Sequence, residues 1–139
     1  MRNAEFGLRH EPDLKKRTKA FALRILKLGD ALPKTAAGRA LASQIVRSST
    51  SVAANYRVAC RARSTSDFIA KMGIVEEEAD ETLFWLELVE ESELVSAAKL
   101  TAIKREADEL IAITVASIKT ARTNRAAHSA FRTLNSGLG

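Results

Sequence analysis

Six basic side chains in the first half of the chain are spaced so that they could bind phosphate groups. At about 100° per residue, four arginines of one predicted helix share a face: Arg39, Arg47, Arg57 and Arg61. Lys15 and Lys19 lie on the predicted helix before it. Because the planar guanidinium group pairs two phosphate oxygens at once, such a row is suited to a nucleic-acid backbone. Nothing resembles a base-reading module and only 5% of the residues are aromatic, so the predicted binding is independent of base sequence.

The same face has a second interpretation. The arginines could remain solvated, or they could form ion pairs with acidic residues of another subunit, around Glu77, Glu78 and Glu81. In that case the protein would be a scaffold whose basic and acidic helices pair between subunits, with no nucleic-acid role.

The residues that usually carry catalysis or bind metals are sparse and poorly placed. Cys60 is the only cysteine, and the two histidines, His10 and His128, lie near the ends of the chain, so no base is expected beside the thiol. Neither histidine belongs to the Glu-x-x-His pair of a di-iron bundle, and Glu76–Glu78 lacks the spacing of a calcium loop. We therefore expect no enzymatic activity, no cofactor and no metal site.

Charge is segregated along the chain. Residues 1–66 contain 14 Lys/Arg and 4 Asp/Glu, whereas residues 67–109 contain 4 Lys/Arg and 13 Asp/Glu. Residues 110–139 contain 4 Lys/Arg and no acid, and the whole chain carries +5. Such separation indicates complementary faces, within one bundle, between subunits or toward a polyanion. The single cysteine and the absence of a long apolar run or signal-peptide core predict a soluble, cytoplasmic protein that does not enter a membrane.

Scarce glycine and proline, together with apolar residues at helical spacing, predict an all-α protein. Thr35 and Ser64 are expected to cap the second and third helices, and Leu32-Pro33 to end the first. Four amphipathic helices with short connections favour an antiparallel up-down-up-down four-helix bundle. The predicted organisation is a flexible N-terminal arm, the bundle and a flexible C-terminal tail, over residues 1–12, 13–123 and 124–139.

Several residues depart from the usual pattern of a helix surface. Gln44, Ser48 and Asn55 lie on or beside the core face of the second helix, where polar groups need hydrogen-bond partners, so we expect structural roles for them. On the third helix, large apolar residues lie opposite the expected core, with an indole at the edge: Ile74, Phe84, Leu88 and Trp85. A solvent-facing helix rarely carries such residues together, so either its own bundle buries this helix on two sides or subunits meet there. In a domain of only four helices we expect an interface between subunits.

Motifs in the second and third predicted helices follow a known family pattern. They include the runs Gln44–Ser48, Ser51–Arg57, Cys60–Ser64, Asp67–Ile69, Lys71–Ile74, Glu76–Thr82 and Trp85–Leu88. Over roughly residues 14–122 the chain resembles the four helix bundle protein family, also called the 23S rRNA intervening-sequence protein family. In place of the commoner Ile-Ala-Glu-Gly after Asn55, this chain has Tyr56–Ala59, which removes an acid and adds an arginine.

The resemblance implies an antiparallel four-helix bundle that assembles into a ring-like homopentamer. Some members are encoded within insertions in large-subunit ribosomal RNA genes, and the role of most members is not established. Related accessory proteins of diversity-generating retroelements bind RNA and a reverse transcriptase through a basic surface. The sequence therefore predicts a non-enzymatic, homo-oligomeric accessory module that binds RNA in preference to DNA. Its candidate partners are itself, a nucleic acid, and a reverse transcriptase or another protein.

Overall fold

The computed structural model describes residues 14–138, which form four α-helices and contain no strand. The helices are α2 (Leu14–Ala31), α3 (Ala36–Ala59), α4 (Thr65–Glu91) and α5 (Ala97–Leu138). The all-α class predicted from the sequence is therefore confirmed. The arm predicted for residues 1–12 lies outside the described residues. Within the described part of the chain, none of the helices has the length and apolar character needed to cross a bilayer.

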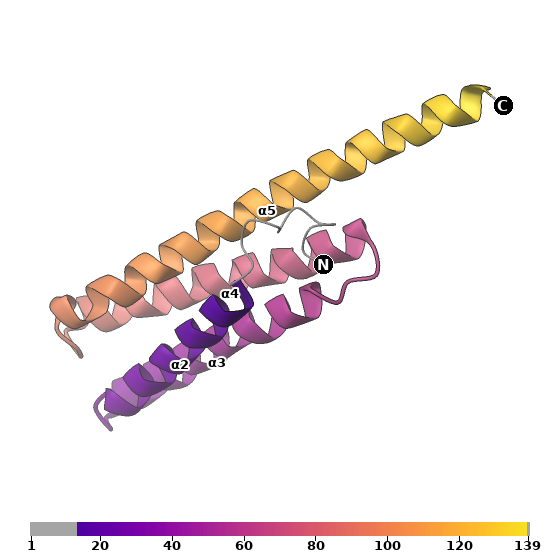
Figure 1. Ribbon diagram of the computed structural model, residues 1–139. Helices are drawn as coiled ribbons and strands as arrows, with labels where there is room; N and C mark the ends of the chain where they lie inside the picture. The colour runs from indigo at the N-terminus through magenta and orange to yellow at the C-terminus, as the bar shows by residue number, and fades with distance from the viewer. Residues whose placement is uncertain (1–13, 139) are drawn as a thin grey trace.

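Consecutive helices pack side by side: α3 lies against α2 and α4, and α4 lies against α3 and α5 (Figure 1). The contact between α2 and α5 is the least extensive. An ion pair supports it, because Arg17 donates to Glu106 at 2.8 and 3.1 Å and to Glu109 at 3.2 Å. The hydrogen bond with Glu106 raises the pKa of Arg17 above its ordinary value. The first and last helices are thus held together partly by charge.

Side-chain caps fix where α3 and α4 begin. The Thr35 hydroxyl accepts a hydrogen bond from the Gly38 backbone N–H at 3.1 Å, and Ser64 accepts one from the Asp67 N–H at 3.0 Å. Each cap satisfies a backbone donor that the first helical turn leaves without a partner, as predicted from the sequence. Only glycine fits at position 38, because a Cβ there would lie 1.9 Å from the carbonyl oxygen of Pro33.

The core face predicted for α3 is largely buried. Ile45, Val52, Tyr56 and Ala59 are fully enclosed, together with Ser48. Leu41, at the N-terminal end of the same face, is only partly buried. The opposite arc is exposed and carries the predicted row of arginines. The helical period therefore separates the two faces of α3 correctly.

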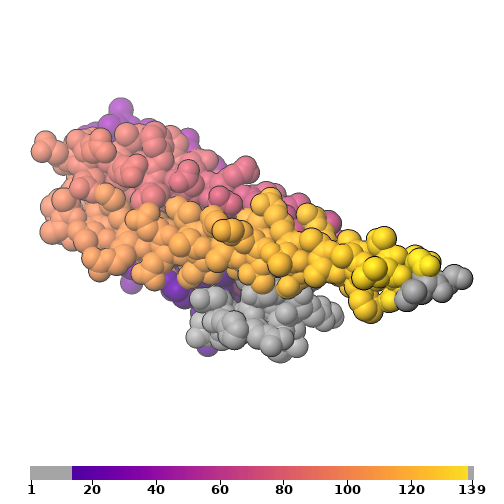
Figure 2. Space-filling model, turned by 90° about the horizontal axis from the view of Figure 1, so that it is seen from above, coloured from indigo at the N-terminus to yellow at the C-terminus, as the bar shows by residue number. Residues whose placement is uncertain are grey.

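α5 is longer than the sequence predicted. It remains helical to Leu138, although residues 124–139 were predicted to form a flexible tail. Ala121 is its last buried residue, and every described residue from Arg122 to Gly137 is exposed. The apolar period fades at this point because burial ends, whereas the alanine- and arginine-rich sequence still favours helix. Figures 1 and 2 show this segment projecting beyond the other three helices.

Candidate nucleic-acid interface

Three of the predicted phosphate-binding residues line one groove between α2 and α3, with a volume of about 520 Å³. Lys15 and Lys19 lie one turn apart at the start of α2, and Arg57 lies in the last turn of α3. The remaining lining residues are small and uncharged: Ala22, Thr50, Ala53 and Ala54. Packing of the start of α2 against the end of α3 therefore gathers cations that are far apart in the sequence.

Among residues 14–138, the charges in this groove have no opposing charge beside them. Lys15, Lys19 and Arg57 are exposed, and none of them forms an ion pair within residues 14–138. None of the described residues that line the groove is acidic. The Thr50 hydroxyl donates to the Val46 carbonyl oxygen at 2.8 Å, so it can offer a ligand only its lone pairs. A concave surface with three uncompensated cations attracts polyanions such as a phosphodiester chain.

Arg47 lies apart from the groove in an ion-pair network between α3 and α4. Its guanidinium group pairs with Glu81 and lies 3.4 Å from a Glu78 carboxylate oxygen. Its Nε donates to Gln44 Oε1 at 3.2 Å, which gives the predicted structural amide a partner on its own helix. Arg47 is thus already occupied by carboxylates of the same chain, although its side chain remains 49% exposed.

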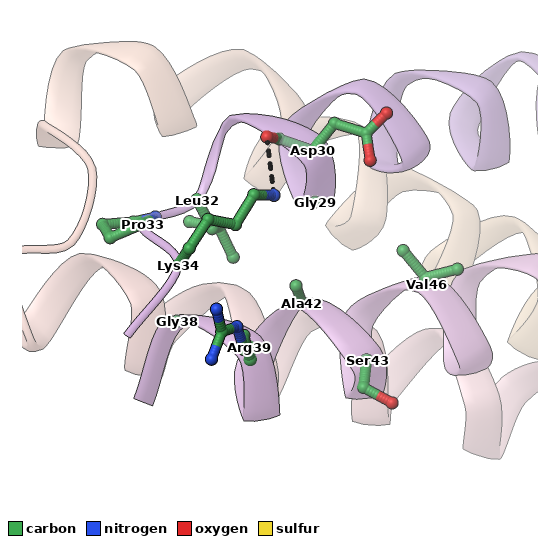
Figure 3. A pocket seen from close by; sticks show the side chains of 10 residues that line it. All are labelled: Gly29, Asp30, Leu32, Pro33, Lys34, Gly38, Arg39, Ala42, Ser43 and Val46. Atoms are coloured by element: carbon green, nitrogen blue, oxygen red, sulfur yellow. Dashed lines mark hydrogen bonds between the residues drawn. The ribbon is translucent and has the colours of Figure 1, made fainter. Parts of the chain in front are cut away.

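The other two arginines of the row also lie outside the groove. Arg39 is 18 residues before Arg57, about 27 Å away along α3. It lines a pocket of about 270 Å³ beside the α2–α3 turn, where Lys34 donates to the backbone oxygen of Asp30 at 3.2 Å (Figure 3). Arg61 is exposed one turn beyond Arg57, just after α3 ends. Arg61 can therefore extend the positive surface of the groove, whereas Arg39 belongs to a separate pocket at the other end of α3.

Polar groups predicted to be structural connect α3 to α4. Asn55 Nδ2 donates at 2.9 Å to both the backbone oxygen and the hydroxyl of Ser51. The Ser51 hydroxyl in turn donates to Glu78 Oε2 at 2.9 Å, so the amide reaches the α4 acid through a serine. Deeper in the interface, the buried Thr82 hydroxyl donates to Ser48 Oγ at 2.8 Å. These bonds satisfy polar atoms that helix packing removes from water.

The outer face of α4 exposes the large apolar residues predicted to form a subunit interface. Phe84 is 49% exposed and Ile74 37% exposed, while Leu88 and Trp85 are partly buried. The rings of Phe84 and Trp85 meet edge to face with centroids 5.0 Å apart, and the indole N–H donates to Glu81 at 3.0 Å. Phe84, Trp85 and Leu88 thus form an apolar cluster, and Ile74 lies about 15 Å away along α4, with Glu77 and Glu81 between them.

The family model of the 23S rRNA-intervening sequence protein matches residues 11–116. The chain belongs to this family. A solved structure from Bacteroides thetaiotaomicron, described as a protein of unknown function from the S23 ribosomal protein family, superposes with a TM-score of 0.72 at 35% sequence identity. The alignment covers 76% of this chain and 98% of that chain. No curated protein matches the sequence.

One feature of the groove was not recognised from the sequence. The small residues that open the groove, Ala22, Thr50 and Ala53, were not predicted as site residues. Thr50 and Ala53 lie about two turns and one turn before Arg57 on the same side of the helix, which is a signal that could have identified them. The helical part of α5 beyond residue 116 lies outside the family match.

Proposed function

We propose that this protein is a non-enzymatic, homo-oligomeric accessory module that binds the phosphate backbone of RNA through the α2–α3 groove. The observation that carries the proposal is the convergence of Lys15, Lys19 and Arg57 in one groove, whose other described lining residues are uncharged. The family's description as a 23S rRNA-intervening sequence protein supports RNA in preference to DNA.

The side chains of the groove suit backbone binding without base recognition. Arg57 can donate two parallel hydrogen bonds to one phosphate group, and the two lysines can neutralise neighbouring phosphates as point charges. The alanines on the groove floor leave space for the sugar-phosphate chain to approach. None of the groove's lining residues within 14–138 is aromatic, so these residues offer bases no stacking platform, and affinity comes from charge.

The proposal includes a finer architecture, an up-down-up-down bundle that assembles as a ring-like homo-oligomer. Short connections between helices that pack side by side support the bundle topology. Exposure of Ile74 and Phe84 supports self-association through the outer face of α4, together with the partly buried Trp85 and Leu88. A pentamer follows from the family resemblance. A ring would repeat the groove once per subunit and so strengthen binding to a long RNA through avidity.

A protein scaffold is the second candidate function. The exposed apolar residues of α4, Ile74 and Phe84, favour it, because such side chains indicate contact with a protein whether or not RNA binds. In a scaffold the groove cations would pair with acidic residues of another subunit. Their removal would then weaken assembly, whereas in the RNA-binding protein it weakens only RNA affinity.

The test is a fluorescence-anisotropy titration of single-stranded RNA with the full chain, accompanied by light scattering. One variant removes the groove cations: Lys15→Ala, Lys19→Ala and Arg57→Ala. A charge-matched control removes three exposed cations of α5: Lys99→Ala, Arg105→Ala and Lys119→Ala. We expect the groove variant to lose about tenfold or more in affinity at low salt with its mass unchanged, and the control to lose much less. Equal losses in both variants, or dissociation of the groove variant, would contradict the proposal.

A further inference from the structure

The side of α5 that is buried in the bundle continues as a basic side where the helix projects beyond the bundle. Ile118 and Ala121 are buried and lie three residues apart. Intervals of four, three and four residues then lead to Arg125, His128 and Arg132, which are exposed. Residues at these intervals share one side of a helix. The basic side of the α5 extension (Arg125, His128 and Arg132, within residues 122–138) therefore lies on the side of the helix that faces the bundle.

A hydrogen bond confirms this orientation. The guanidinium group of Arg125 donates to Ser66 Oγ at 3.1 Å, at the start of α4. Arg125 therefore lies at the end of the bundle where α3 is connected to α4, and the extension projects from this same end (Figure 1). Arg57, the arginine of the groove, lies in the last turn of α3 and so at this end as well.

The chain between the groove and this hydrogen bond is also basic. From Arg57 to Ser66 the sequence contains two further arginines, Arg61 and Arg63, and no acid, and both are exposed. Asp67, the next acid, is partly buried in the first turn of α4, where the helix dipole favours a negative charge. Within residues 14–138, no arginine of the α3–α4 connection or of the extension forms an ion pair. The positive surface of the groove thus continues past this connection to the extension.

We infer that the basic side of the α5 extension is a second phosphate-binding surface, which binds the same RNA chain as the groove where that chain continues beyond the end of the bundle. The inference rests on the proposed function and lengthens its binding site. Arg125 and Arg132 are about 10 Å apart along the helix, so they contact different phosphates. Each guanidinium group can donate two hydrogen bonds to one phosphate, as Arg57 can in the groove.

The position of the apolar side chains argues against a lipid surface as the partner. A helix that lies on an anionic membrane buries its apolar side and keeps its cations near the headgroups. Phe131 and Leu134 are 61% and 69% exposed, but they lie on the side of the extension opposite the arginines. Insertion of these two side chains into lipid would therefore turn Arg125 and Arg132 away from the headgroups.

Photo-crosslinking of the full chain to single-stranded RNA tests which side of the extension contacts RNA. A benzophenone amino acid replaces Ser129, on the side of the arginines, or Leu134, on the opposite side. A third probe, at Ala54 in the groove, tests the proposed function by itself. We expect crosslinks from Ala54 and Ser129, and a several-fold lower yield from Leu134. Crosslinks from Ala54 with equal or no yield from the other two positions would overturn the inference alone, whereas no crosslinks from Ala54 would contradict both proposals.

Affinity for RNA strands of two lengths gives an independent outcome. The extension variant, Arg125→Ala/Arg132→Ala, is compared with a control, Lys99→Ala/Arg105→Ala, which removes two exposed cations near the other end of α5. Alanine favours helix, so both variants keep α5 helical. For a strand of about 16 nucleotides, the extension variant should bind about fivefold more weakly at low salt, and the slope of log affinity against log salt should fall by about 1.4. A strand of about 4 nucleotides occupies the groove alone, so the original chain and both variants should bind it alike.

The outcomes separate this inference from the proposed function. If the extension variant binds the long strand as well as the original chain does, or loses equally for both strands, the inference fails while RNA binding by the groove stands. If the original chain binds neither strand, both fail. A fall in the mass of the extension variant in light scattering would assign the arginines to a subunit contact. Loss of binding to anionic vesicles without loss of RNA affinity would assign them to a lipid surface. Either result would overturn the inference.

Discussion

Arg47 and Arg57 lie on the exposed side of one helix, yet the structure assigns them different roles. Replacing Arg47 with alanine removes the ion pairs with Glu78 and Glu81 and leaves Glu78, whose side chain is only 18% exposed, with Ser51 as its remaining side-chain partner. We expect a loss of about 1 kcal/mol in the free energy of unfolding, since one pair is solvent-exposed and the other partly buried. Arg57→Ala breaks no ion pair among the described residues, so its stability should change by less than about 0.5 kcal/mol.

The two variants are each measured by urea denaturation at one protein concentration and by titration with single-stranded RNA. Arg47→Ala should lower the unfolding midpoint and leave RNA affinity nearly unchanged. Arg57→Ala should weaken RNA binding and leave the unfolding midpoint nearly unchanged. Each variant is thereby the control for the other, because both lose one arginine from the same helix. The reasoning would be refuted if Arg47→Ala were as stable as the original chain and weakened RNA binding more than Arg57→Ala.

Further substitutions test the packing that positions the groove. Gly38→Ala should lower the free energy of unfolding by several kcal/mol, because the new Cβ would lie 1.9 Å from the carbonyl oxygen of Pro33. Thermal melting measures this loss of stability. An unchanged melting temperature would contradict the turn geometry. Ser48→Ala and Thr82→Val should each cost about 1 kcal/mol, and the double variant less than their sum, since both changes remove the same hydrogen bond between Ser48 and Thr82. Strict additivity in a double-mutant cycle would argue against this bond.

The sequence predicts where helices begin and which side of each is buried. Thr35 and Ser64 can be identified as caps because capping is local, involving a side chain and a backbone N–H three residues later. Burial of Ile45 and Val52 follows equally from the helical period. Caps and helical faces depend on residues that are close together along the chain, so they can be predicted from the sequence.

Contacts between helices are harder to predict. The sequence places Arg47 and Arg57 on one arc, but only the packing of α4 beside α3 shows that Glu78 and Glu81 reach the first of them. The grouping of Lys15 with Arg57 likewise depends on how α2 lies against α3. The helical state of residues 124–138 was not predicted for a different reason, because loss of the apolar period indicates loss of burial and not loss of helix.

The salt dependence of RNA binding tests the central claim most directly. Affinity of the full chain for single-stranded RNA is measured from about 50 to 200 mM salt, for the original chain and for the Lys15→Ala/Lys19→Ala/Arg57→Ala variant. Each lost phosphate contact should reduce the slope of log affinity against log salt by about 0.7, so three should reduce it by about 2. Such a reduction, absent from the α5 control variant, is the predicted result. A slope that is the same for the original chain and the groove variant would contradict the assignment of the groove as the phosphate-binding surface.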